Sequence, residues 1–117
     1  MNGMNFLDLV KARYSVRSYR PQAVEREKVE YLLECARLAP SAVNFQPWRF
    51  FVVASDARRE ALRRCYHREW FAEAPLCREA LELPATLRPV VLIPVGYPAD
   101  APTQKKRKSP DEVAEWC

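Results

Sequence analysis

The chain has 117 residues, with ten prolines, two glycines and a formal net charge of +4 at pH 7. This length is sufficient for one domain and too short for two, and a hydrophobic fraction of 49% argues against a disordered chain. Two glycines leave no phosphate-binding glycine loop of the dinucleotide or P-loop type. The excess of basic over acidic residues favours an anionic partner. The main classes of such a partner are nucleic acid, an acidic membrane surface and a phosphorylated cofactor.

The cysteines indicate neither a metal site nor a disulfide framework, because no C-x-x-C pair occurs and the chain has a single histidine. No secretory signal is recognised at the start, and no apolar run approaches the length of a membrane span. We therefore expect a cytoplasmic protein with no bound metal, no membrane partner and four reduced thiols, at Cys35, Cys65, Cys77 and Cys117.

Helical spacing of apolar residues predicts the elements of the first third of the chain. Asn5 is expected to cap a helix that runs to about Arg13. A second helix is expected over residues 25–38, and Pro40 ends it. Further helical segments are expected from residue 55 or 56 to about residue 67, over residues 77–83, and as a short turn near Val113 and Trp116.

Two short apolar runs predict strands. Residues 49–54 read as a buried strand, and residues 89–97 form a second run rich in Val and Ile. The two runs are far apart in sequence and the predicted helices outnumber them. This pattern favours an α+β class over a parallel α/β sheet.

Residues 13–19 carry the first chemical signal. Alternate residues of an extended segment share one face, so Arg13, Ser15 and Arg17 would offer two guanidinium groups and a hydroxyl to a phosphate dianion. A basic edge strand, kept soluble by its charges, explains the same residues.

Two further segments have polar groups in suggestive places. In the loop at residues 40–47, two prolines fix the path while Ser41, Asn44 and Gln46 offer donors and acceptors. Taken alone, these residues are explained better by an ordinary connection in which Asn and Gln bond the local backbone. The basic run at residues 105–108 follows a stiff proline-rich spacer, and it either folds back over a phosphate or forms a solvated tail.

Together, and in this order, the three segments resemble the nitroreductase family. Arg13-x-Ser15-x-Arg17 is similar to its N-terminal signature, and the sequence PSAVNFQPW at residues 40–48 is similar to its helix–loop–strand signature. Residues 89–98 and the basic residues that follow resemble its last strand and C-terminal arm. The resemblance covers residues 4–75 and 78–116 of what we expect to be one domain over residues 1–117.

The resemblance implies an FMN site between the two subunits of a homodimer. In the family, the positions matched by Arg13, Ser15 and Arg17 hold the phosphate and the ribityl chain of FMN. The positions that reach the flavin from the other subunit are matched by Pro40, Ser41, Ala42 and Asn44. The positions that close on the phosphate are matched by Lys105 and Arg107.

The implied reaction is hydride transfer from NAD(P)H to the flavin, and then to a nitro compound, a quinone or a similar small-molecule electron acceptor. No side chain needs to act as an obligate acid or base, because the cofactor carries the redox chemistry.

One departure from the family concerns the middle of the chain. After a segment like residues 70–75, members continue with a buried strand, the long central helix of the dimer and a further strand whose loop faces the flavin. Here residues 75–77 run directly into residues 78–81, which resemble a segment well beyond those elements. We therefore expect an incomplete nitroreductase-like fold, with helices around a small, mostly antiparallel sheet.

Two other functions remain as alternatives. The chain is either a catalytically inactive remnant that serves as a dimerisation or interaction module, or a basic nucleic-acid-binding domain. The second is disfavoured because it needs aromatic and basic residues interleaved on one surface, whereas Trp48, Phe50 and Phe51 lie in apolar runs that indicate a core.

Overall fold

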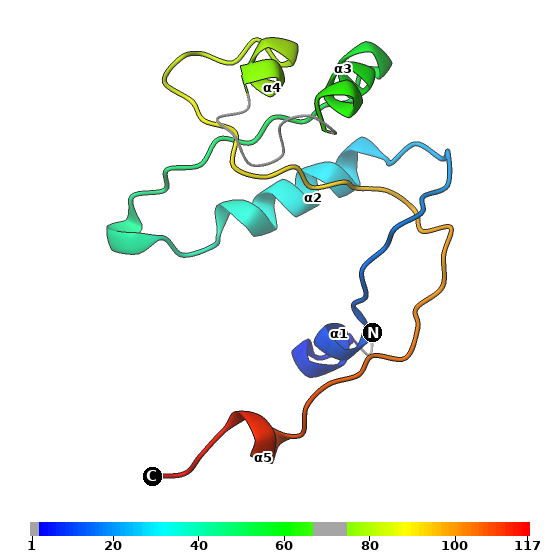
Figure 1. The fold of residues 1–117 in the computed structure, drawn as a ribbon, viewed down its shortest axis with the longest axis vertical. Helices are drawn as coiled ribbons and strands as arrows, with labels where there is room; N and C mark the ends of the chain where they lie inside the picture. The colour runs from blue at the N-terminus through cyan, green and yellow to red at the C-terminus, as the bar shows by residue number, and fades with distance from the viewer. Residues whose placement is uncertain (1–2, 67–74) are drawn as a thin grey trace. The chain divides into compact units, whose positions relative to one another are not determined.

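The computed structural model of the chain describes residues 3–66 and 75–117, which divide into two units (Figure 1). Unit 1 combines Met1–Val24 with Val95–Cys117, and unit 2 is Glu25–Pro94. The two ends of the sequence therefore belong to one unit, and the central segment forms the other. That residues 1–117 act as a single domain stays a prediction.

Helix α1 of unit 1 (Phe6–Ala12) begins where the sequence predicts. The Asn5 side chain accepts a hydrogen bond from the backbone N–H of Asp8 at 3.0 Å, which satisfies one of the first-turn donors. Asp8 lies in the first turn and Lys11 in the last, so both charges complement the helix dipole. The prediction for this helix is confirmed.

The segment after α1 is extended and lies beside the segment that follows residue 95 (Figure 1). Tyr19 and Pro98 form an antiparallel bridge. Two backbone hydrogen bonds flank it, from Arg20 N to Tyr97 O at 2.8 Å and from Ala99 N to Ser18 O at 2.9 Å. Further along, the short helix α5 (Pro110–Val113) begins with a capping box between Ser109 and Glu112.

Unit 2 is built from helices and loops. Its elements are α2 (Arg26–Arg37), the 3-10 turn η1 (Ala42–Asn44), α3 (Asp56–Tyr66) and α4 (Pro75–Ala80). Helices α2 and α3 confirm the predicted positions, although residue 67 at the expected end of α3 lies outside the described residues. Helix α4 begins two residues before the predicted start at 77 and ends before the predicted end at 83.

Helix α3 packs against α4, and this contact holds the best-buried apolar residues that the structure describes, Cys77 and Leu81. At its edge Arg58 pairs with Glu82 at 2.9 Å and donates from Nη1 to the carbonyl oxygen of Leu81 at 3.5 Å. Two buried side chains make a small core, so most of the described apolar residues of unit 2 are in contact with solvent.

The predicted strands are not formed, since no strand occurs in the described residues. An isolated bridge at Pro98 lies just beyond residues 89–97, and a backbone bond from Arg20 N reaches the carbonyl oxygen of Tyr97 at their end. A strand is stable only when its backbone groups pair with a neighbouring strand over several residues, and among the described residues neither segment is paired in this way. Pro89 and Pro94 further lack the N–H that a ladder needs. The described residues therefore contain no sheet of the kind expected for the α+β fold.

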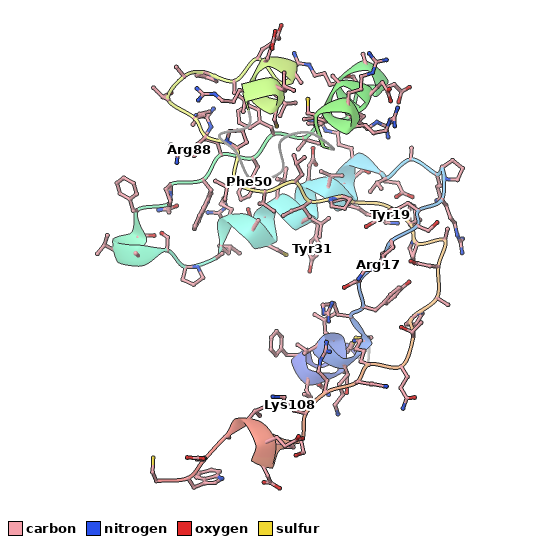
Figure 2. The ribbon with its side chains drawn as sticks, viewed as in Figure 1. Arg17, Tyr19, Tyr31, Phe50, Arg88 and Lys108 are labelled. Carbon is pink, nitrogen blue, oxygen red and sulfur yellow. The ribbon has the colours of Figure 1, made fainter. Side chains whose placement is uncertain are left out.

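The prediction that residues 49–54 are buried is also wrong. Phe50 and Phe51 are 49% and 46% exposed, and Trp48 is half-buried, so these aromatics do not form a core. Figure 2 shows Phe50 on the segment that follows η1. The cause is the same as for the missing ladder, because a strand buries its side chains only within a layered sheet.

No helix of the described part of the chain combines the length and the apolar character that crossing a membrane requires.

Candidate functional site

Basic side chains gather in unit 1 around Lys105. The ammonium group of Lys105 donates to the carbonyl oxygen of Lys11 at 2.7 Å, which satisfies an acceptor in the last turn of α1. Lys105 is half-buried, and burial together with the nearby charges of Arg13 and Arg107 lowers its pKa below the ordinary value. Three of the predicted phosphate-binding cations are thus close enough to repel one another.

These cations have no carboxylate partner. Among the described residues, none of Arg13, Arg17, Lys105 and Arg107 makes an ion pair. Several arginines of unit 2 do form ion pairs, and on helix α3 Arg59 pairs with Asp56 while both Arg63 and Arg64 pair with Glu60. A group of like charges without counter-charges is an electrostatic receptor for an anion.

Asp100 organises the extended segment that carries the arginines. Its Oδ2 accepts hydrogen bonds from the backbone N–H groups of Arg17 at 2.8 Å and Ser18 at 3.2 Å. Its carbonyl oxygen accepts from the hydroxyl of Tyr14 at 3.2 Å. The sequence interpretation did not identify Asp100, although a lone acidic residue between two basic segments, directly after GYPA, was a signal that could have marked it.

Gly96 allows the two segments of unit 1 to approach closely. A Cβ atom at this position would lie 2.8 Å from Cδ1 of Tyr19, well inside van der Waals contact. The ring of Tyr19 therefore covers the backbone at Gly96 where another residue would place a side chain.

The loop around η1, in unit 2, has an unusual backbone. Val43, Asn44 and Gln46 have φ values of 48°, 54° and 50°, a left-handed conformation that β-branched residues rarely adopt. The Ser41 hydroxyl holds the loop by accepting from Gln46 N at 2.9 Å, while Asn44 N donates to the Ser41 carbonyl oxygen at 3.0 Å. Backbone strain of this kind persists only where surrounding contacts impose it, and it is frequent at ligand-binding loops.

The polar side chains of this loop divide into two kinds. Ser41 and Gln46 bond the local backbone, the latter from Nε2 to the Asn44 carbonyl oxygen at 3.3 Å, as an ordinary connection would require. The Asn44 side-chain amide has no partner among the described residues. Asn44 is therefore the loop residue that keeps both a donor and an acceptor for a ligand.

The structure brings the predicted residues together only in part. Arg13, Lys105 and Arg107 are neighbours, and Ser15 and Arg17 lie on the same extended segment of unit 1. The predicted loop residues all belong to unit 2: Pro40, Ser41, Ala42 and Asn44. In the part of the chain that the structure describes, the four cysteines are free thiols and no cluster of His, Cys, Asp or Glu has the arrangement of a metal site.

Comparison with known proteins relates the chain to the nitroreductase family. The model of the nitroreductase family matches residues 10–76. Over 59 residues the chain is 42% identical to the putative NAD(P)H nitroreductase YdgI of Bacillus subtilis, covering 50% of this chain and 28% of that protein. It is 40% identical to YodC of the same organism, another putative NAD(P)H nitroreductase, over 72 residues, or 60% of this chain and 36% of YodC.

A third relative has a different name. The major NAD(P)H-flavin oxidoreductase of Aliivibrio fischeri is 41% identical over 51 residues, which are 43% of this chain and 23% of that enzyme. No solved structure matches the chain. The chain therefore spans between 23% and 36% of the length of these relatives. The matched region contains both the extended basic segment and the loop around η1, and the chain belongs to the nitroreductase family.

Proposed function

We propose that the protein is an FMN-dependent oxidoreductase of the nitroreductase type. It would transfer hydride from NAD(P)H, through the flavin, to a nitro compound, a quinone or a similar small-molecule acceptor. Family membership supports the class of reaction, and the name of the Aliivibrio fischeri relative links similar sequences to flavin and NAD(P)H.

The observation that carries this proposal is the unpaired basic group of unit 1. Lys105 has a lowered pKa because burial and the charges of Arg13 and Arg107 disfavour its protonated form, and among the described residues no carboxylate forms an ion pair with any of these three cations. A phosphate group supplies that missing negative charge and accepts several charge-assisted hydrogen bonds at once. The residues therefore fit the FMN phosphate, with Ser15 and Arg17 completing the site from the same segment.

Bound FMN would supply the two-electron chemistry, and the protein would bind, orient and shield it. We assign the phosphate to Arg13, Ser15, Arg17, Lys105 and Arg107. The loop residues Pro40, Ser41, Ala42 and Asn44 would reach the flavin of the partner subunit in a homodimer, where the free amide of Asn44 can both donate and accept.

The exposed apolar surface supports the homodimer. Val43 and Phe45 at the tip of the loop are 97% and 76% exposed, and few of the described residues of unit 2 are buried. Large exposed apolar side chains of this kind indicate an interaction surface. In the assembled protein we expect residues 49–54 and 89–97 to pair as strands of the small family sheet, because both are apolar and extended but lack a neighbour here.

We also assign the protein to the cytoplasm, since NAD(P)H is the reductant and free thiols such as Cys35 and Cys117 are typical of reducing compartments.

The test compares FMN with riboflavin, which lacks the phosphate. We expect FMN to bind at least about tenfold more tightly, the equivalent of one charge-assisted hydrogen bond, and the preference to decrease with added salt. Fluorescence quenching of both flavins at two salt concentrations measures it. Equal affinities would refute the assignment of a phosphate site.

A matched pair of variants makes this test specific. Arg13→Gln and Arg20→Gln remove the same charge from the same segment, but Arg20 is not among the residues assigned to the phosphate. Only Arg13→Gln should reduce the preference for FMN. An equal reduction in both variants would mean that net charge alone, rather than a built site, attracts the cofactor.

One observation favours the alternative function, an inactive dimerisation or interaction module. The described core contains only Cys77 and Leu81, and an edge such as residues 49–54 can recruit a partner chain without any cofactor. Light scattering and a turnover assay with NAD(P)H, added FMN and a quinone separate the two. A homodimer that binds FMN and turns over supports the oxidoreductase, and a homodimer that does neither supports the module.

A further inference from the structure

We propose that Asp100 is a positioning residue for phosphate binding. Its carboxylate holds the extended segment of unit 1 so that the arginines of that segment and the cations of the C-terminal arm meet one anion. The inference rests on the proposed function and adds to it a residue that does not itself contact the cofactor.

The hydrogen bonds of Asp100 reach residues on both sides of Ser15. Tyr14 donates to its carbonyl oxygen at 3.2 Å, and the N–H groups of Arg17 and Ser18 donate to its Oδ2 at 2.8 and 3.2 Å. One residue thus holds both ends of the short stretch that contains Ser15. Backbone N–H groups bound to a carboxylate form charge-assisted bonds, which are about twice as strong as neutral ones.

The same residue fixes the start of the C-terminal arm. Lys105 follows Asp100 by five residues, so it cannot lie further than about 17 Å from it along an extended chain. Lys105 is anchored in turn on the carbonyl oxygen of Lys11, next to Arg13. Asp100 and Lys105 therefore attach the arm to the N-terminal segment at two points, and Arg13 lies between these attachments along that segment.

Asp100 is unsuited to contact the phosphate, because two negative groups repel each other. Its other oxygen, Oδ1, is buried and has no hydrogen-bond partner among the described residues. A buried acceptor without a donor is unfavourable, so the contacts of Oδ2 and of the carbonyl must offset it. This is consistent with a role in holding the backbone rather than in binding ligand.

The two possible effects of Asp100 on anion binding have opposite signs, which makes the inference testable. Asp100→Ala removes a negative charge, and Coulomb's law alone predicts tighter FMN binding. If Asp100 positions the segment, the variant binds FMN more weakly instead. Asp111→Ala is the matched control, since it removes an exposed carboxylate from α5 in the same unit without touching the segment.

The experiment titrates the parent, Asp100→Ala, Asp100→Asn and Asp111→Ala with FMN and with riboflavin. In Asp100→Ala we expect the preference for FMN to fall about tenfold or more, which is the loss of one charge-assisted bond, while riboflavin affinity stays within about twofold. Asp100→Asn keeps an oxygen for the two amides, so it should restore part of the preference and serves if the alanine variant does not fold. Asp111→Ala should retain or slightly increase the preference.

A second readout concerns the backbone itself. Amide hydrogen exchange at Arg17 and Ser18 should accelerate in Asp100→Ala and remain slow in Asp111→Ala. A parent that prefers FMN, with an Asp100→Ala variant that retains the preference, overturns the role of Asp100 alone. A parent that binds FMN and riboflavin equally overturns the proposed function and the inference built on it.

Discussion

Replacement of Gly96 by alanine should separate the two segments of unit 1 and weaken the site that they form. The added Cβ would lie 2.8 Å from Cδ1, 3.4 Å from Cγ and 3.5 Å from Cε1 of Tyr19. Ordinary van der Waals contact begins at about 3.4–4 Å, so either the ring or the backbone must move by at least about half an ångström. Gly96 does not have a positive φ, so the penalty comes from this contact and not from backbone conformation.

The free energy cost of Gly96→Ala comes from overpacking against Tyr19 and from the neighbouring backbone hydrogen bonds. Forcing an extra methyl group into a filled contact typically costs about 1–3 kcal/mol. The ring of Tyr19 is 38% exposed, so part of the strain can be relieved by its rotation toward solvent, and the lower half of that range is expected. If the segments separate, the flanking bonds at Arg20 and Ala99 open with them.

Amide hydrogen exchange measures this opening locally. A cost of about 1–2 kcal/mol corresponds to exchange at Arg20 and Ala99 that is faster by about 5- to 30-fold. Gly3→Ala is the matched control, because a Cβ at Gly3 meets nothing within 4 Å and should change stability by less than about 0.5 kcal/mol.

A double-mutant cycle with Tyr19→Ala identifies the cause. If the ring is the obstacle, Gly96→Ala should cost almost nothing once the ring is removed. Unchanged exchange in Gly96→Ala, or an equal cost with and without the ring, would refute the close packing of Gly96 and Tyr19 as the reason for the glycine.

Three further predictions concern single side chains. Asn44→Gly should weaken FMN binding in a fluorescence titration while changing the free energy of unfolding by less than about 0.5 kcal/mol, because glycine adopts the left-handed φ of 54° without strain. A large loss of stability with unchanged FMN affinity would contradict the role of Asn44 in binding the flavin. The pKa of Lys105 is lowered in the folded chain, so the unfolded chain binds more protons at pH values between that lowered pKa and 10.5. The free energy of unfolding should therefore rise with pH across this window. Denaturant titrations should show this rise in the parent protein and not in Lys105→Met. Hydrogen bonds from Arg63 and Arg64 lower the pKa of Glu60 from 4.5 to about 2. The stability that Glu60 contributes to helix α3 should therefore be present above pH 4.5 and be lost as the pH falls through about 2. The helix content measured by circular dichroism should differ between the parent and Glu60→Gln above this window and converge below it.

The helices could be predicted because their signals are local. Asn5 caps α1 by bonding an N–H three residues away, and the apolar spacing of α2 repeats within each turn. The strands could not be predicted in the same way. Residues 49–54 have the composition of a strand, but whether they form one depends on a neighbouring strand, and the described residues contain none.

The same distinction between local and long-range signals applies to the candidate site. The positions of Arg13, Ser15 and Arg17, and the motif around Asn44, are evident in the sequence because residue type and spacing carry the resemblance to the family. The sequence also indicates that Lys105 and Arg107 are basic, but it leaves open whether they form a solvated tail or fold back.

Only the tertiary structure decided that question. Lys105 bonds Lys11 and Asp100 bonds Arg17, across separations of 94 and 83 residues. No local pattern encodes contacts over such distances, since they depend on how the whole chain closes on itself. Composition and spacing determined which residues of this protein can bind an anion, and the folded chain determined which of them meet, because like charges come together only where other contacts hold them.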